Sequence, residues 1–550
     1  MKKYFQIPIK KVAVVTLLAA GVLIQPSCKK TLEEKPQSQY TTNTFFANTD
    51  EAYMATMGVY EIMSSQNTYG FYISMVFDID TDIAQMQGSD FSNDPRVAAH
   101  YGITPVHGYL IQVWSAFYKG IDRANLVIQQ IPQMPLFTSG TDAQKASLKR
   151  MLAEAKFLRG FYYSELVRLF GDVPFKLTPT QATDDLQLPR TDRMTIYTQV
   201  IKDMTEAIDD IPWASQKTSD ERLSKGAVKG MLARVALFAG GYSLRQNGQM
   251  ERPANYQDYY TIAKTQTTDI MNSGEHVLNA SYQQIFQNQC KLTLEPKECM
   301  FEVAFYNSAG NSPNSGFIGT WNAPIAVAGN PYGRANSFYK AMAPFQKTYA
   351  TGDLRRDVAV CTYSLDINGN PVQIAASKDD TWSPGKWRRD WQGTSPKDLN
   401  NTDINWCVLR YADVLLMRAE AENELNNGPN ADAYNAINMV RRRAFGKPLT
   451  TANVAVDLPA GQDKTTFLKS IQQERAWELC YEGIRKADLI RWNILGPTLR
   501  ATQVAAKAYR SNYPYVAGTN FVDGKHELYP IPAAEFDVNH NPGFTQNPKY

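Results

Sequence analysis

The sequence predicts a mainly α-helical protein, in which a scaffold of tetratricopeptide-like helix pairs carries an inserted lobe of loops and short strands. Apolar residues recur three or four positions apart over most of residues 45–278 and again over 406–550, which is the period of an amphipathic helix. Between residues 279 and 405, frequent Gly, Pro, Asn and Trp interrupt that period and favour loops and short strands. The solenoid is one of several helical folds open at this point, because the W-x2-L-G pattern of the tetratricopeptide repeat is not visible.

Bulk composition argues against several functional classes. The 550 residues carry a net charge of only +3, so no strongly basic surface favours nucleic-acid binding. There are five histidines and no H-E-x-x-H motif, which argues against a catalytic zinc site, and neither Gly-rich nucleotide-binding motif occurs. The 30 Tyr, 24 Phe and 9 Trp are enough to supply exposed stacking surfaces as well as a core.

Residues 1–27 are predicted to be a signal peptide. Four lysines within the first eleven residues precede an apolar run over 12–24, which is shorter than the roughly 20 residues that span a bilayer, and no comparable run follows. Cys28 comes soon after. It is either incidental, beside an ordinary cleavage site, or the lipid-modified first residue of the mature chain; Ser27 suits a lipobox and Gln25 does not. Residues 28–44 are polar and predict a flexible tether.

Helical periodicity locates the elements of the scaffold. The first helix is expected from Asp50, and an irregular stretch over 65–108 follows; a loop region this long inside a compact protein is usually functional. Further helices are predicted at 114–128, 143–170, 195–211, 224–242, 256–271, 411–425, 431–445 and 465–492. In the last of these, Glu482 and Lys486 are expected to pair at i, i+4.

The inserted segment, 279–405, holds one clear hairpin signal. Residues 361–374 alternate around Asn368-Gly369, a dipeptide that favours a tight turn. Cys290 and Cys299 are close enough in sequence to bridge a loop in an oxidising compartment, and this disulfide stays an open alternative.

Dispersed motifs give the chain a family resemblance. They run from Glu51-Ala-Tyr and Gly58-Val-Tyr through Trp114, Tyr118, Ile121 and Ala124-Asn125, Ala153-Glu-Ala-Lys-Phe-Leu-Arg-Gly-Phe-Tyr-Tyr and Phe170-Gly-Asp-Val-Pro, Leu409-Arg-Tyr-Ala-Asp-Val-Leu-Leu-Met-Arg-Ala-Glu-Ala, Val440-Arg-Arg-Arg-Ala, Gln473-Glu-Arg-Ala-Trp-Glu-Leu and Glu482-Gly-Ile-Arg-Lys-Ala-Asp-Leu-Ile-Arg-Trp to Tyr529-Pro-Ile-Pro and Gln546-Asn-Pro-Lys-Tyr. In this order they resemble the SusD/RagB family of outer-membrane glycan-binding lipoproteins of Bacteroidetes. Gly160 stands where that family commonly has Ala.

The resemblance implies a fold, a location and a partner. It implies a helical core with four tetratricopeptide-like pairs, a ligand site on a less regular lobe, and a SusC-like TonB-dependent transporter underneath. It also implies that the mature chain begins at a lipid-bearing Cys28 on the outside of the outer membrane. The charged residues of the strongest motifs, such as Glu154, Arg475 and Arg491, are expected to be structural ion pairs between helices.

A glycan site needs aromatic faces to stack on sugar rings and polar side chains to bond their hydroxyls, placed on loops held by a rigid scaffold. The two loop regions supply the candidates Tyr69, Phe71, Tyr72 and Asp90, then Trp321, Asn322, Tyr332 and Arg334, with Phe91, Tyr101, Asn336, Phe338, Trp382, Trp387 and Trp391 nearby in sequence. The acidic run Asp78–Asp82 does not fit an EF-hand, because Ile83 occupies the position that requires Gly.

The predicted function is capture of oligosaccharides or polysaccharides at the cell surface and delivery to the transporter, without catalysis, cofactor, bound metal or nucleic acid. Two alternatives remain at this point. A surface glycoside hydrolase would need a pair of carboxyl groups on either side of the glycosidic bond, and the 54 acidic residues of the chain are enough to supply one. A related binder could instead take a peptide or glycopeptide.

Overall fold

The computed structural model describes residues 45–218, 220–306, 314–393 and 401–550. Residues 48–550 form one compact unit, separate from the N-terminal unit that ends at Ala47. The predicted signal peptide, Cys28 and the predicted tether lie outside the described residues. Within the described ranges, no helix is both long enough and apolar enough to cross a membrane.

The first half of the unit is helical, as predicted, and its ends follow ordinary capping chemistry. Its elements are α2 (Thr49–Ser64), α3 (Tyr72–Met75), α4 (Asp94–Ala99), α5 (Gly108–Gln130), η2 (Ile131–Gln133), α6 (Pro135–Ser139), α7 (Asp142–Phe170), α8 (Arg193–Ala207), η3 (Ala214–Gln216), α9 (Lys225–Ala239) and α10 (Tyr256–Ser273). A capping box between Thr141 and Gln144 starts α7. Gly171, at φ +77°, ends it, since a positive φ suits glycine.

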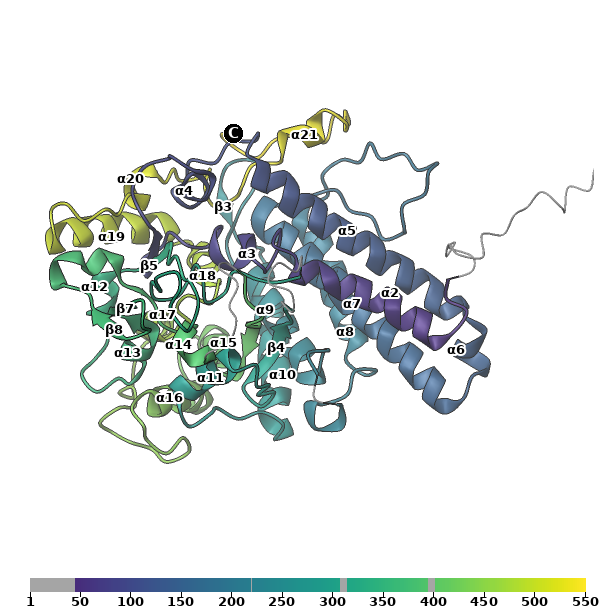
Figure 1. The fold of residues 1–550 in the computed structure, drawn as a ribbon. Helices are drawn as coiled ribbons and strands as arrows, with labels where there is room; N and C mark the ends of the chain where they lie inside the picture. The colour runs from purple at the N-terminus through teal and green to yellow at the C-terminus, as the bar shows by residue number, and fades with distance from the viewer. Residues whose placement is uncertain (1–44, 219, 307–313, 394–400) are drawn as a thin grey trace, which may run out of the picture. The chain divides into compact units, whose positions relative to one another are not determined.

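Successive helices pack against one another, which confirms the predicted pairing. Helix α5 packs on α7, α7 on α8, α8 on α9 and α9 on α10, while α2 lies across α5 and α7 (Figure 1). Helix α10 then contacts α15 (Tyr411–Leu425), so the chain returns to the same stack after the insertion.

The last third of the chain is also helical. Its elements are α15, α16 (Ala431–Ala444), α17 (Lys464–Glu478), α18 (Arg485–Arg491), α19 (Leu495–Tyr509), α20 (Ala517–Asn520) and α21 (Ala533–Phe536). The single helix expected over 465–492 is wrong: the chain leaves the helix after Glu478, with Tyr481 at φ +66° and Gly483 at φ +70°, a region closed to a continuous right-handed helix. Helix α19 was not predicted.

The break also separates Glu482 from Lys486, so their expected i, i+4 pair is wrong. Glu482 accepts hydrogen bonds from Arg410 and Lys386, whereas Lys486 donates to the Tyr529 hydroxyl. Both side chains therefore tie distant segments to the turn.

The insertion consists of short strands, short helices and loops, as expected. Its elements are α11 (Tyr282–Cys290), β4 (Cys299–Val303), β5 (Tyr339–Ala341), α12 (Ala343–Gln346), α13 (Arg355–Ala359), β6 (Val360–Cys361), β7 (Tyr363–Leu365), β8 (Pro371–Gln373), η4 (Ala376–Thr381), β9 (Ser383–Pro384) and α14 (Arg389–Gln392). The predicted hairpin is confirmed: β7 pairs antiparallel with β8, and Gly369 takes φ +81° in the turn.

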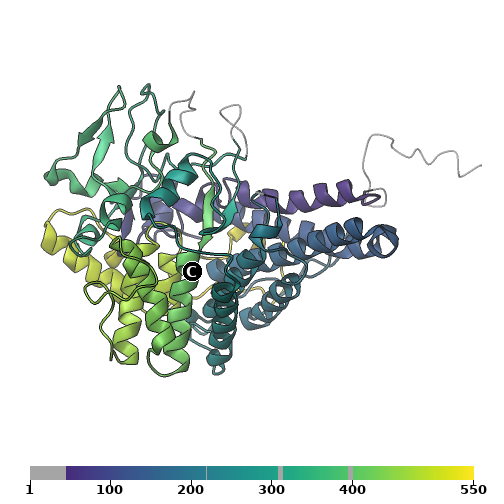
Figure 2. The ribbon, with the colours of Figure 1, turned by 90° about the horizontal axis from the view of Figure 1, so that it is seen from below.

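Two-stranded antiparallel ladders attach the insertion to the rest of the chain. Strand β1 (Ala84–Met86) pairs with β5, and β10 (Trp406–Arg410) pairs with β4, whereas β2 (Ser243–Leu244) pairs with β3 (Met250–Glu251) inside the helical half. Figure 2 shows the loops and strands of the insertion on the same side of the helices as α2. The β1–β5 ladder thus brings the predicted loop region 65–108 together with residues 314–342 of the predicted insertion.

Candidate ligand-binding site

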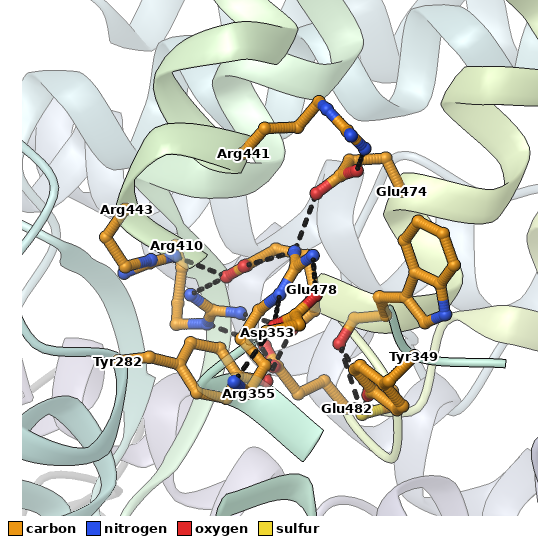
Figure 3. Close-up of polar contacts among 12 residues, drawn as sticks. Tyr282, Tyr349, Asp353, Arg355, Arg410, Arg441, Arg443, Glu474, Glu478 and Glu482 are labelled. Carbon is orange, nitrogen blue, oxygen red and sulfur yellow. Dashed lines mark hydrogen bonds and ion pairs between the residues drawn. The ribbon is translucent and has the colours of Figure 1, made fainter. Parts of the chain in front are cut away.

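The largest cluster of charge in the strongest motifs is buried and structural. Arg410, at the end of β10, donates to Glu478 at 2.9 Å and to Glu482 at 2.8 Å (Figure 3). It also donates to Glu298 at 2.9 Å. Arg355 and Arg443 bond the same Glu478, and the side chains of Arg410 and Glu478 have no exposed surface. Buried carboxylates that are each held by guanidinium forks join elements and do not contact a ligand.

The other charged residues of the recognisable motifs also form ion pairs with little or no exposed surface, so their predicted structural role is confirmed. The pairs are Glu154 with Arg222, Arg159 with Asp203, Glu474 with Arg355, Arg475 with Asp413 and Asp488, Arg485 with Asp82, and Arg491 with Glu420. The acidic run near Asp80 is likewise engaged, since Asp80 pairs with His100 at 2.6 Å and Asp82 with Arg485.

A continuous set of aromatic side chains forms where the two loop regions meet; we call Phe71, Tyr72, Tyr109, Phe317, Trp321 and Phe338 the aromatic cluster. Ring centroids lie 4.3 Å apart for Phe71 and Trp321, 5.0 Å for Phe71 and Phe317, 5.3 Å for Phe71 and Tyr72, 4.1 Å for Tyr72 and Tyr109, and 4.4 Å for Trp321 and Phe338. The structure therefore brings together three of the eight predicted residues, Phe71, Tyr72 and Trp321.

Backbone hydrogen bonds hold the aromatic cluster in place. The Phe317 amide donates to the Gly70 carbonyl at 2.9 Å, and the Tyr339 amide of β5 donates to the Trp321 carbonyl at 3.0 Å. A side chain on Gly70 would collide with the Ser65 carbonyl oxygen, 2.8 Å from the Cβ position, so this close turn depends on glycine.

The solvent exposure of the rings differs along the aromatic cluster. Phe71 and Tyr72 are 6% and 8% exposed, whereas Tyr109, Phe317, Trp321 and Phe338 are partly exposed. A platform of this kind keeps its rings in a single orientation while leaving some of their surface for a ligand.

Polar groups surround the aromatic cluster. The Tyr72 hydroxyl donates to the exposed Gln112 side chain at 2.7 Å, and burial, followed by the nearby Asp94 carboxylate, raises the pKa of Tyr72 to about 12. His107 lies edge-on to Tyr109 with centroids 4.8 Å apart, and burial lowers its pKa. These groups are neutral near pH 7, which suits hydrogen bonding to uncharged hydroxyls.

An open cavity of about 360 Å³ adjoins the aromatic cluster through Gln112. Its wall is made by the end of α2, the following loop and one face of α5, and it is lined by Glu61, Ile62, Ser65, Asn67, Ile111, Gln112, Ser115, Ala116 and Lys119. The lining supplies hydroxyl, amide and ammonium groups and the Glu61 carboxylate, which pairs with Arg123, within a volume that falls in the usual range of ligand pockets.

The other predicted site residues lie elsewhere. Tyr69 is 5% exposed and stacks on Phe161 of α7, and Asn322 is fully buried, where it accepts a hydrogen bond from the Gly319 amide at 2.8 Å. Asp90 is exposed and pairs with Arg96 at 2.8 Å. These side chains shape the loops around the aromatic cluster.

Tyr332 and Arg334 belong to a second feature, beside the β7–β8 hairpin. Tyr332 packs on a small apolar cluster that includes Ala326 and Leu365, and the exposed Arg334 donates to Asn336. The nearby tryptophans are largely core residues: Trp387 is 1% exposed and stacks on Trp406 with centroids 5.1 Å apart.

Sequence reasoning missed Tyr109, Gln112 and Phe317. Tyr109 and Gln112 lie in the first turns of α5, directly after the long loop, so the signal available was a polar-aromatic helix start next to a functional loop. The disulfide considered for Cys290 and Cys299 does not form, because the structure has both as buried free thiols.

Sequence models of two families cover most of the chain. One, the SusD family, matches residues 333–550, and the other, described as starch-binding and associating with the outer membrane, matches residues 30–237. The crystal structure of a SusD homolog from Bacteroides thetaiotaomicron VPI-5482 is 32% identical, covers 92% of this chain and 98% of that chain, and superposes with a TM-score of 0.86. The chain belongs to the SusD/RagB family and has its mainly α fold.

Two further relatives are similar over nearly the whole length. SusD-like protein P25 of Formosa agariphila is 27% identical over an alignment of 553 positions, which covers 93% of this chain and 94% of that protein. Surface glycan-binding protein A from Bacteroides thetaiotaomicron, in complex with laminarihexaose, shares the fold at 20% identity with a TM-score of 0.68, over 90% of this chain and 99% of that one.

Proposed function

We propose that this protein binds oligosaccharides or polysaccharides at the cell surface through the aromatic cluster and delivers them to a SusC-like TonB-dependent transporter. The observation that supports this most directly is the packed group of rings of Phe71, Tyr72 and Trp321, which ranges from buried to partly exposed. Gln112 and a cavity of about 360 Å³ lie beside it. Family membership and the laminarihexaose complex of a relative support a glycan as the ligand.

Binding without catalysis is part of the proposal. The acids of the recognisable motifs are buried in ion pairs, and the aromatic cluster itself contains no carboxylate. The adjoining cavity is lined by a single acid, Glu61, which pairs with Arg123. A retaining or inverting hydrolase needs two carboxyl groups facing one bond. Incubation with starch and laminarin should therefore release no new reducing ends; turnover abolished by one Asp or Glu substitution would contradict this part.

Calorimetric titration with laminarin, starch and other glycans tests the binding site. Trp321→Ala should weaken binding of whichever glycan the wild type takes by at least about tenfold, equivalent to ~1.4 kcal/mol, because the stacking face is removed. Tyr332→Ala is the matched control, since Tyr332 lies on the separate hairpin feature. If Tyr332→Ala loses binding and Trp321→Ala does not, the glycan site lies at the hairpin feature and not at the aromatic cluster. If the wild type binds peptides and no glycan, the proposed ligand class is wrong.

Location and partner are tested separately. We propose that Cys28 carries the lipid that anchors the chain to the outer membrane; Cys28→Ala should then appear in the soluble fraction, and unchanged membrane fractionation would contradict it. Purification in mild detergent should recover a TonB-dependent transporter with the wild-type protein, and recovery of the protein alone would exclude a stable complex.

A further inference from the structure

Two thiols and one carboxylate converge beside the β4–β10 ladder. Cys299 and Glu302 lie on β4 and Cys407 on β10, and one ligand atom from each lies within 4.8 Å of the other two. All three residues are buried. No residue of this group belongs to the aromatic cluster.

The strand geometry explains how Cys299 and Glu302 come to share a face. Residues three apart on a regular strand point to opposite sides, but the register shifts from Arg410–Cys299 to Leu409–Phe301, so β4 holds an extra residue there. Such a bulge turns the following residues by one position. Glu302 thus faces the same side as Cys299 and lies directly opposite Cys407, while Phe301 packs on Phe161 of α7.

We propose that Cys299, Cys407 and Glu302 bind one Zn²⁺ or a similar thiophilic divalent cation. Thiolate and carboxylate are ordinary zinc ligands, and tetrahedral coordination at about 2.0–2.3 Å needs ligand atoms only ~3.3–3.8 Å apart. Three protein ligands leave a fourth position for water. Side-chain adjustments of about an ångström close the geometry.

Neighbouring side-chain amides orient two of the three ligands, Cys299 and Glu302. The Gln289 side chain donates to the Cys299 sulfur at 3.4 Å and is itself held by the Trp387 indole, which donates to Gln289 at 2.9 Å. The Asn405 amide donates to Glu302 at 3.0 Å. Such outer partners are typical of metal ligands, whose direction they determine.

The ligands also have an entry path. Cys299 and Glu302 line a cavity of about 90 Å³ that opens beside Glu221 and Glu295, which is ample for water and an ion.

Metal binding to the Cys28→Ala chain, purified under reducing conditions, tests the site, because its only thiols are then the five buried ones. We expect one zinc per chain by elemental analysis after dialysis, and a thiolate-to-cobalt charge-transfer band when Co²⁺ replaces it. Cys407→Ser should abolish the band and Glu302→Gln should weaken Zn²⁺ binding at least tenfold. Cys361→Ser, which alters a buried thiol outside the site, should keep both.

Each other outcome overturns the proposal. It fails if neither zinc nor the cobalt band is found in the folded wild type, if Cys407→Ser binds metal as the wild type does, or if a non-reducing digest of the native protein contains a Cys299–Cys407 disulfide. Far-ultraviolet circular dichroism establishes that each variant is folded. Zn²⁺ should also raise the melting temperature of the wild type and of Cys361→Ser but not of Cys407→Ser, since only a site in the folded state stabilises it.

Discussion

Replacing Glu478 by Gln should be among the most destabilising single changes in the described part of the chain. One Glu478 oxygen accepts from Arg410 at 2.9 Å and Arg443 at 2.6 Å, and the other from Arg355 at 3.2 Å. Burial alone would raise the pKa of Glu478, yet the three guanidinium groups hold it well below its usual value. The glutamine is the same size, but it removes the negative charge that three buried guanidinium groups share and leaves them only their other carboxylate partners. It also turns an N–H₂ group toward donors.

The expected loss of stability in Glu478→Gln is estimated from general values for buried ion pairs. Breaking a buried ion pair by removing one partner costs about 3–5 kcal/mol. An unfolding entropy of about 2.1 cal/mol/K per residue over the roughly 500 residues of the compact unit gives ~1 kcal/mol/K. The melting temperature should therefore fall by about 3–5 °C if the unit unfolds together.

Differential scanning calorimetry measures the shift, with Glu206→Gln as the matched control. Glu206 bonds Lys156 at 2.7 Å but is 41% exposed, and exposed pairs contribute about 0–1 kcal/mol. Equal melting temperatures for Glu478→Gln and Glu206→Gln would refute the argument that burial makes this pairing indispensable.

Two further predictions concern single positions. Lys340 is 1% exposed, and burial lowers its pKa to about 7, so it is charged in both states below pH 7, whereas between pH 7 and 10 only the unfolded chain holds the proton. Denaturant titrations should therefore show the stability of the wild type rising relative to that of Lys340→Met across this window, by on the order of 5 kcal/mol. A stability difference that does not change with pH would count against the burial of an uncharged amine. In urea titrations, Gly483→Ala and Gly248→Ala should each lower the free energy of unfolding by about 1–2 kcal/mol, because both glycines have a left-handed φ. Gly483→Ala should lower it further, because a Cβ on Gly483 would lie 3.3 Å from Trp406 while a Cβ on Gly248 meets open space. Equal losses would show that the Trp406 side chain moves aside.

The sequence predicted the elements whose signal is local. Tyr411–Leu425 is a helix with the predicted bounds, and Asn368-Gly369 makes the predicted hairpin turn, because periodicity and turn chemistry act within a few residues. The break after Glu478 was missed, since Tyr481 adopts a positive φ in response to tertiary contacts. Of the candidate site, Phe71, Tyr72, Trp321 and Phe338 were named from the sequence. Phe317 was missed because its contact with Phe71 joins loop regions that meet through long-range pairing, such as that of β1 with β5 about 250 positions apart. Tyr109 was missed although it starts the helix that directly follows the long loop.

The buried charges and the aromatic cluster are parts of one arrangement. Arg355 lies in the insertion, Glu478 on α17, and Arg410 at the end of β10, so their mutual bonds span the junction between insertion and scaffold. Apolar contacts tolerate sliding, but a shift of the insertion along α17 would leave one of these charges buried and uncompensated, at a cost of about 3–5 kcal/mol. Directional ion pairs therefore keep the insertion in one register, and through β5 they keep Trp321 against Phe71. This accounts for strong sequence motifs in residues that touch no ligand.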